Sequence, residues 1–298
     1  MKIITIIVTF NAEKWLDCCI SSVANSSIPI DIMVIDNQSN DSTCNIIKSK
    51  YPFVKLVESE SNLGFGKANN IGLQYAIDND YDYIYLLNQD AWVKENTIGN
   101  LISIQKCNKK YGILSPFQCQ ANLKHLDFNF ARDTCSWQSN DNLLDDLYFN
   151  SIDEVYEVKR VMAAHWLISR ECLLKVGGFS PSFPHYGEDY NYCERVQFHG
   201  FSVGICPSCR AVHDREFRIE SINKIRYIHG YIKPIRILSN INANNKIKEL
   251  CEAFVVLLFK YHTIISLSQF IKLIFSYKKI LLNRKISEKE CAFLNKKY

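Results

Sequence analysis

The chain has 298 residues, of which 47% are hydrophobic and 22% are charged, and its net charge is +4. This length suits one large domain or a domain with an appendage, and the hydrophobic fraction is enough for a substantial core. The composition therefore excludes a disordered chain. The sequence has no low-complexity tract, and it has no internal repeat of about 20–50 residues, so a repeat protein is excluded as well.

The charge is unevenly distributed along the chain. Residues 220–298 hold 15 Lys and Arg against 5 Asp and Glu, or +10, so residues 1–219 carry −6 of the total of +4. A basic tail suits an anionic surface, either a membrane or a nucleic acid, although a solvated helical face has the same composition. Nucleic-acid binding is not expected, because the tail lacks a sheet motif that interleaves basic and aromatic residues.

The twelve cysteines do not indicate a disulfide framework. The first apolar run, Ile3 to Val8, is too short for a signal peptide and has no small-residue cleavage site, so we expect a cytoplasmic protein with mostly reduced, buried cysteines. Cys206 and Cys209 form a Cys-x-x-Cys pair. A zinc site is not expected there, because no second Cys or His pair follows at ligand spacing.

Strands and helices are predicted to alternate over the first ninety residues. The β-branched or aromatic runs that predict strands are KIITIIVTFN (2–11), IDIMVID (30–36), FVKLVES (53–59) and YDYIYLLNQD (81–90). The segments that predict helices are 12–27, a stretch beginning near Asp41-Ser42, and 64–79. This alternation is typical of βαβ units, so the predicted fold class is α/β, with a mainly parallel sheet flanked by helices.

Polar residues follow three of these strands at the point where each strand ends. They are Thr9-Phe10-Asn11, Asp36-Asn37 and Asn88-Gln89-Asp90. Open parallel sheets bind ligands outside the carboxyl ends of their strands. A ligand site is therefore expected at this edge.

The second half of the chain is less regular. We expect a strand at His165–Ser169, a helix from Arg170, a turn at Gly177-Gly178, a helix from Glu188 and a strand at Phe201–Ile205. The acids Glu188 and Asp189 would then lie at a helix N-terminus, where the helix dipole favours ionised carboxylates.

The C-terminal segment is predicted to be helical but not to cross a membrane. Its apolar run, Ala253 to Phe259, is far shorter than the roughly 20 residues that a spanning helix needs, and Lys260, His262 and Lys272 interrupt the apolar residues after it. One helical face would carry Ile264, Leu267, Ile271 and Ile274, with Lys272, Lys278, Lys279, Arg284 and Lys285 nearby. This face either lies on a bilayer surface or packs against the body.

Six motifs occur in an order that resembles the family 2 glycosyltransferases, particularly their bacterial rhamnosyltransferase-like branch. They are VTFN, VIDNQSNDST, NLGFGKANNIG, LLNQD, VGGF followed by YGEDYNYCERVQFHG, and AVHD, and the resemblance covers roughly residues 2–215. It implies a Rossmann-like GT-A domain over residues 1–219 with a basic helical extension over 220–298. It also implies inverting transfer of a sugar from a nucleoside diphosphate donor.

The resemblance implies a divalent cation, Mn²⁺ or Mg²⁺, at the end of the fourth strand. The family's Asp-x-Asp motif reads Asn88-Gln89-Asp90 here. Asn88 would contact the donor with a neutral oxygen, and the metal would be held mainly by Asp90 and the donor's phosphates. His213 matches the family's late histidine and is a candidate further ligand. The alternatives are that Asp90 only caps a strand and that His213 is a surface histidine.

The family pattern also places a general base in its Glu-Asp motif. Asp189 is the expected base, which accepts the proton of the acceptor hydroxyl. Glu188 is expected to bind the acceptor or to tune Asp189. The alternative is that both acids are only favourable residues at a helix start.

Further residues match the family's donor-binding positions or are candidates for the acceptor. Asp36, Thr9 and Asn11 are expected near the base or ribose, and the acceptor candidates are Trp166 and Tyr186, whose aromatic faces could pack on a sugar or belong to the core. The residues expected beside the ribose and diphosphate are Gly64, Gly66, Lys67, Asn69 and Asn70.

The motif forms indicate dTDP-rhamnose as the first expectation for the donor and a UDP-sugar as the second. The acceptor is expected to be a glycan or lipid-linked saccharide in bacterial surface polysaccharide synthesis, with the protein peripheral on the inner face of the cell membrane. One alternative is an inactive nucleotide-sugar-binding or scaffold protein, which only the missing acid at Asn88 favours. Nucleotidyl transfer is not expected, because no Gly-rich loop with Arg and Lys follows the first strand. The oligomeric state stays open.

Overall fold

The first ninety residues form the alternating pattern that their sequence predicts. The computed structural model describes residues 1–136, 142–215, 222–243, 251 and 264–295. Its first strands are β1 (Ile3–Thr9), β2 (Asp31–Asp36), β3 (Lys55–Glu58) and β4 (Tyr83–Asn88), joined by helices α1 (Leu16–Ala24), α2 (Thr43–Lys50) and α3 (Phe65–Asp78). These strands are parallel in the order β3-β2-β1-β4.

The parallel arrangement brings the polar strand ends together. Thr9 is the register partner of Asp36 across β1 and β2, and Val8 is the partner of Asn88 across β1 and β4. The residues that follow these strands therefore meet at one edge of the sheet, as ligand-binding residues do in open α/β folds.

The second half of the sheet is mixed rather than parallel. Strand β8 (His165–Ser169) runs antiparallel between β4 and β6 (Tyr111–Cys119), and β9 (Ser202–His213) is parallel to β6. The short strands β5 (Ala91–Val93) and β7 (Tyr156–Val158) pair antiparallel with β9. Because β8 runs antiparallel to β4, the residues just before β8 lie at the ligand edge of the sheet. Ala164 is one of them, and its carbonyl oxygen accepts from the Asn88 N–H at 3.0 Å.

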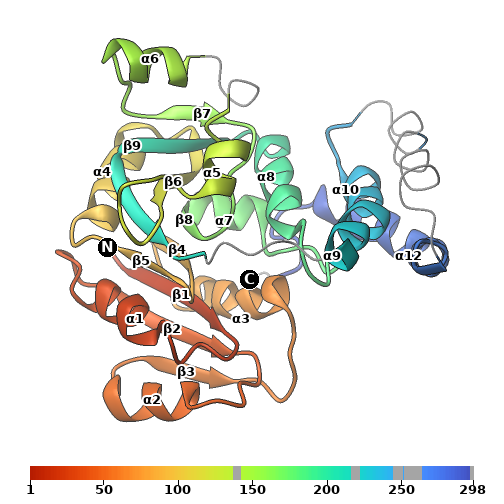
Figure 1. Cartoon of the computed structure of the whole chain (residues 1–298), viewed down its shortest axis with the longest axis horizontal. Helices are drawn as coiled ribbons and strands as arrows, with labels where there is room; N and C mark the ends of the chain where they lie inside the picture. The colour runs from red at the N-terminus through yellow and green to blue at the C-terminus, as the bar shows by residue number, and fades with distance from the viewer. Residues whose placement is uncertain (137–141, 216–221, 244–250, 252–263, 296–298) are drawn as a thin grey trace.

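Helices cover both faces of the sheet (Figure 1). The described helices of the body that follow β5 are α4 (Thr97–Cys107), α5 (Phe128–Asp133), α6 (Leu143–Phe149), α7 (Arg170–Val176) and α8 (Glu188–Phe198). The apolar sides of α1, α2 and α4 pack on one face, and those of α3, α7 and α8 pack on the other. Each face has its own apolar core because a parallel sheet is buried on both sides.

The C-terminal helices lie beside α8 at one end of the molecule (Figure 1). Those described are α9 (Ile222–Tyr227), the π-helical η1 (Ile228–Ile232), α10 (Lys233–Ser239) and α12 (Ile264–Ser287). The predicted boundary near residue 219 falls outside the described residues. The end of the chain returns to the body: Cys291 and Leu294 pack with the core beneath α7 and α8, and Ala292 O accepts the Gly178 N–H.

The exposed side of α12 is the side that carries part of the predicted apolar stripe. Ile271 and Ile274 are exposed, so they do not pack on the body, whereas Leu273 and Ile280 are buried against α10 and Phe183. The side chains of residues 264 and 267, and the run 253–259, lie outside the described residues. Within the described residues, no helix has the length and apolar content needed to cross a bilayer.

Candidate active site

A hydrogen-bonded turn joins the ends of β1 and β2. Asp36 is buried, and its Oδ1 accepts from Thr9 Oγ1 at 2.8 Å and Ser39 Oγ at 2.5 Å, while its Oδ2 accepts from Ser39 N at 2.8 Å. Asn11 is exposed, has a positive φ of 50°, and accepts from Asn40 N. The structure therefore brings Thr9, Asn11 and Asp36 together, with Asp36 fixing the turn and Asn11 facing solvent.

The loop before α3 is pressed against the segment that leads to α8. Gly64 has φ of +76°, and a Cβ on it would lie 2.6 Å from Pro184 O, so both its backbone and its surroundings require glycine. Asn37 holds this loop through the N–H of Leu63 and the carbonyl of Gly64. Lys67, on the first turn of α3, is exposed.

Asn69 and Asn70 bind protein backbone instead of presenting amides to a ligand. Asn69 is buried and donates to Phe65 O in its own helix. Asn70 accepts from the Phe179 N–H at 2.7 Å and donates to Phe179 O at 3.0 Å. The prediction for these two residues is therefore wrong, because a segment more than a hundred residues later supplies the partners of Asn70, and the first residue of α3 supplies that of Asn69. The effect of Asn70 is to hold the Gly178-Phe179 turn on α3.

The middle residue of the Asn88-Gln89-Asp90 motif also holds backbone. Gln89 Oε1 accepts from the Phe10 N–H at 2.7 Å, and its Nε2 donates to Phe10 O at 3.2 Å. This pair of hydrogen bonds fastens the end of β1 to the end of β4. Asn88 and Asp90, on either side of Gln89, are only partly buried.

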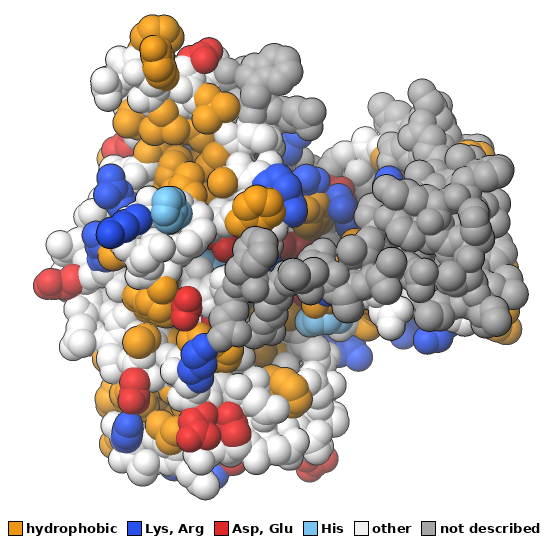
Figure 2. Space-filling model, in the orientation of Figure 1, with side chains coloured by type: hydrophobic (Ala, Val, Ile, Leu, Met, Phe, Trp, Pro, Cys, Tyr) orange, Lys and Arg blue, Asp and Glu red, His pale blue; other side chains and the backbone are white. Residues whose placement is uncertain are grey.

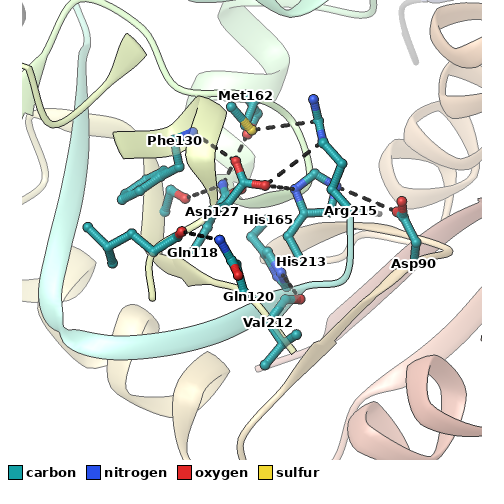
Figure 3. Close-up of polar contacts among 12 residues, drawn as sticks. Asp90, Gln118, Gln120, Asp127, Phe130, Met162, His165, Val212, His213 and Arg215 are labelled. Carbon is teal, nitrogen blue, oxygen red and sulfur yellow. Dashed lines mark hydrogen bonds and ion pairs between the residues drawn. The ribbon is translucent and has the colours of Figure 1, made fainter. Parts of the chain in front are cut away.

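Asp90 lies beside His213 in a row of acidic and basic side chains (Figure 3). His213 Nε2 is 3.6 Å from Asp90 Oδ1, and His213 Nδ1 is 3.9 Å from Asp127 Oδ2, which is also 3.9 Å from Arg215 Nε. His213 is only 1% exposed, so it is not the surface histidine of the alternative interpretation. Burial raises the pKa of Asp90, but the hydrogen bond and charge of His213 outweigh it and hold that pKa below its ordinary value.

Two protein ligands fit a hard divalent cation at this place. The separation of 3.6 Å between Asp90 Oδ1 and His213 Nε2 is short enough for both to bind one ion at about 2.0–2.2 Å. The described residues contain no group of three His, Cys, Asp or Glu that would form a complete protein site. Mg²⁺-type ions commonly take one or two carboxylates and complete their shell with phosphate oxygens and water. The pair therefore fits a cation that a bound diphosphate completes.

Asp127 was not predicted as part of the site. Its Oδ1 caps α5 by accepting from the Phe130 N–H at 2.8 Å, and its Oδ2 faces His213 and Arg215. A ligand histidine is usually oriented at its other ring nitrogen by a carboxylate, a backbone carbonyl or water, and Asp127 Oδ2 lies 3.9 Å from that nitrogen, beyond hydrogen-bond distance. The Asp-x-x-Phe helix start is a local signal for the cap, but the pairing with His213 depends on β9.

A cavity of about 560 Å³ joins the end of β4 to the start of α8. Asn88 lies on its wall, as do Glu188 and Asp189, whereas Asp90 and His213 are not among the residues that line it. Figure 2 shows basic and acidic side chains gathered near the place where the body meets the C-terminal part. The basic residues in the cavity wall are Arg132, Arg160, Arg215, Lys224 and Arg236.

Glu188 is buried and unpaired at the first turn of α8. Its Oε2 has no hydrogen-bond partner in the part of the chain that the structure describes. Burial, together with the neighbouring charge of Asp189, raises the pKa of Glu188 to about 8. Glu188 is thus largely protonated near neutral pH, when it can donate a hydrogen bond.

Asp189 is partly exposed to the cavity. Its Oδ1 accepts from the Tyr190 N–H at 2.8 Å. Burial raises the pKa of Asp189, and this hydrogen bond and the positive charges of Arg236 and Arg160 only partly oppose the rise. A carboxylate with a raised pKa is a better proton acceptor than a surface aspartate.

The start of α8 is fixed by the C-terminal helices. Gly187 has φ of +87°, and a Cβ there would lie 2.9 Å from Ile232 Cγ2. Tyr186, also at positive φ, lines the cavity, and Lys224 Nζ lies 4.9 Å from its ring centroid. Tyr186 therefore lies in the wall of the cavity, and its role as an acceptor platform stays a prediction.

Trp166 is not available as a platform. It is fully buried, and its ring stacks on Phe179 with 12° between the planes. The prediction for Trp166 is wrong, because β8 is an internal strand and this position faces the core between the sheet and α8.

Comparisons with known proteins show what the chain is similar to. Residues 4–125 match the family model described as glycosyl transferase family 2. The chain is 21% identical over 253 residues to the low-salt glycan biosynthesis hexosyltransferase Agl10 of Haloferax volcanii, covering 81% of this chain and 75% of the relative. It is 24% identical over 230 residues to the dTDP-rhamnosyl transferase RfbF of Shigella flexneri, covering 74% and 73%.

Solved structures show the same fold. TarS of S. aureus in complex with UDP-GlcNAc superposes with a TM-score of 0.58 at 15% identity, covering 97% of this chain and 90% of that one. The mannosyltransferase PcManGT of Pyrobaculum calidifontis, in complex with GDP-Man and Mn²⁺, gives 0.60 at 14% identity, covering 96% and 85%. The predicted GT-A fold is confirmed.

Proposed function

We propose that this chain is a family 2 glycosyltransferase and that it moves a sugar with inversion from a nucleoside diphosphate donor to an acceptor hydroxyl, with Asp189 as the base. One observation carries the proposal. A single cavity contains both the end of β4 at Asn88 and the carboxyl pair Glu188 and Asp189. A sugar in that cavity can have its leaving group on one side and the base on the other.

The base side provides proton transfer. Asp189 accepts the proton of the acceptor hydroxyl as that oxygen attacks the anomeric carbon, a contribution of typically about 10²–10⁴-fold. Glu188, neutral near pH 7, does not repel the developing charge and donates a hydrogen bond to the acceptor.

The donor side binds the nucleotide and its diphosphate. Thr9, Asn11 and Asp36 form the turn that receives the nucleoside, and Lys67 on the first turn of α3 is exposed for phosphate. Asp90 and His213 would hold Mn²⁺ or Mg²⁺. When bound, the cation would neutralise charge that grows on the diphosphate as the bond to the sugar breaks.

The first donor to test is dTDP-rhamnose, followed by UDP-sugars. Support comes from the similarity to a dTDP-rhamnosyl transferase and from the likeness of the fold to TarS, which was solved with UDP-GlcNAc. A thermal-shift screen of dTDP, UDP and GDP, each with and without Mn²⁺, tests this because a ligand of the native state raises the unfolding midpoint. We expect dTDP with Mn²⁺ to give the largest shift. No shift with any nucleotide would contradict the proposed function.

The proposed acceptor is a glycan or lipid-linked saccharide of a bacterial surface polysaccharide, reached at the inner face of the membrane. The exposed side of α12 supports a peripheral position: Ile274, Phe275 and Leu282 are 57%, 84% and 59% exposed, and Lys278 and Lys279 lie among them. Co-sedimentation with vesicles containing phosphatidylglycerol should fall when Phe275 and Ile274 are replaced by Ser. Equal binding by that variant would remove α12 from the proposal.

A further inference from the structure

Two arginines share one tyrosine ring beside the proposed base. Arg236 Cζ lies 3.7 Å and Arg160 Cζ lies 4.3 Å from the centroid of the Tyr190 ring. All three side chains line the cavity, and Tyr190 directly follows Asp189 in α8. Arg160 comes from the segment that enters β8, and Arg236 comes from α10.

Neither arginine has a carboxylate partner at ion-pair distance within the residues that the structure describes. The charges of Glu194 and Asp189 act on Arg236, yet its Nε is buried without a hydrogen-bond partner in the described part of the chain. Cation–π contact with Tyr190 offsets part of the repulsion between two like charges, but it satisfies none of their N–H donors. A buried donor without a protein partner, such as Arg236 Nε, can be completed by an ordered water or by a ligand.

The position of the two arginines separates them from the diphosphate. A base that takes the acceptor's proton lies across the anomeric carbon from the leaving group. Arg160 and Arg236 flank the residue next to that base, whereas Arg215 lies two residues from His213 and faces Asp127 on the donor side. A ligand that pairs with Arg160 and Arg236 is therefore part of the acceptor.

We propose that Arg160, Tyr190 and Arg236 form an acceptor subsite for an anionic group, so that the acceptor sugar carries a phosphate or a carboxylate near the hydroxyl that receives the transfer. The guanidinium group binds both groups through paired N–H donors, while the tyrosine ring keeps the two arginines in place. This subsite rests on the proposed function of Asp189 as the base. It also makes α10 a part of the acceptor site.

Calorimetric binding to the full chain, saturated with the nucleoside diphosphate that it prefers, tests the subsite. The probes are glucose 6-phosphate, glucuronate and glucose, which distinguish phosphate from carboxylate and either from a neutral sugar. Because one charge-assisted hydrogen bond is worth about a factor of ten, we expect at least one anionic probe to bind about tenfold more tightly than glucose. Arg160→Gln and Arg236→Gln should each lose that preference.

Arg210→Gln is the matched control, because Arg210 is exposed on β9 outside the cavity wall, and it should keep the preference. Arg236→Lys keeps the charge but not the planar guanidinium group, so its preference for the anionic probe over glucose should be weaker than that of the wild type but still present. This variant tests the subsite if Arg236→Gln does not fold. Equal binding of all three probes, no binding of either anionic probe, or the same loss in Arg210→Gln would overturn the subsite. Failure of nucleoside diphosphate binding would instead overturn the proposed function.

Discussion

The proposed donor and acceptor parts of the site differ in how completely their polar groups are satisfied. On the donor side, Asp36 and Gln89 already have protein hydrogen-bond partners for their side-chain oxygens. On the acceptor side, Glu188 Oε2 and Arg236 Nε are buried without partners among the described residues, and the pKa of Glu188 is raised to about 8. The turn at the ends of β1, β2 and β4 is thus preformed, although His213 Nδ1 nearby is also buried without a hydrogen-bond partner among the described residues. The acceptor side holds groups that a substrate would satisfy.

The largest expected effect belongs to the acceptor side. Asp189→Asn removes the proton acceptor and should lower kcat for sugar transfer by about 10²–10⁴-fold, with nucleotide affinity unchanged. Asp133→Asn is the matched control, because Asp133 also lines the cavity but pairs with Arg132. Its kcat should stay within about tenfold of wild type. A similar loss of kcat in both variants would contradict the role of Asp189 as the general base.

The next effect belongs to the donor side. Asp90→Asn removes the one carboxylate of the proposed cation pair and should raise the Mn²⁺ dissociation constant by about 10–100-fold, measured by electron paramagnetic resonance with bound nucleoside diphosphate. Asp214→Asn, next to His213 in the chain, should leave that constant unchanged. Unaltered Mn²⁺ binding by Asp90→Asn would exclude Asp90 as a ligand.

The unpaired Glu188 predicts a pH dependence of stability. Its folded-state pKa of about 8 lies above the ordinary value of 4.5, so the folded protein holds this proton more tightly than the unfolded chain does. The stabilisation is fully present below pH 4.5 and is lost as the pH rises towards 8.

Glu188→Gln should therefore lose less stability than wild type between about pH 5.5 and 8. The difference should be on the order of 2 kcal/mol in the free energy of unfolding from denaturant titrations. Asp214→Asn should keep the wild-type slope. Parallel curves for wild type and Glu188→Gln would show that Glu188 ionises normally.

The smallest effect tests how far the donor side is preformed. Gln89→Ala removes two hydrogen bonds to the backbone of Phe10, which is exposed enough for water to replace them. We expect a loss of about 1 kcal/mol in the free energy of unfolding and a change of only a few-fold in nucleotide affinity by calorimetry. A hundredfold loss of affinity would show that the ends of β1 and β4 are not rigid without Gln89.

The local features of the fold and site could be predicted from the sequence. Strand periodicity predicted β1, β2 and β4, and the polar residues after them indicated the donor edge. Glu188 and Asp189 are neighbours in the chain, so their position at a helix start needed no tertiary information.

The errors arose mainly where the partner of a residue lies far away in the chain. Asn70 binds Phe179, and Trp166 is covered by the same phenylalanine, which no local pattern reveals. Arg160 reaches the cavity because β8 runs antiparallel, and Arg236 because α10 packs over the start of α8. The sequence showed these two arginines only as part of a charge distribution.

The stereochemistry of the transferred sugar tests the central claim most directly. If Asp189 activates the acceptor hydroxyl across the anomeric carbon from the diphosphate, one displacement occurs and the product has the opposite anomeric configuration to the donor. Proton NMR of the product from the nucleotide sugar that the enzyme accepts measures this configuration. Inversion is the result that this geometry predicts, and retention of the donor's configuration would contradict it.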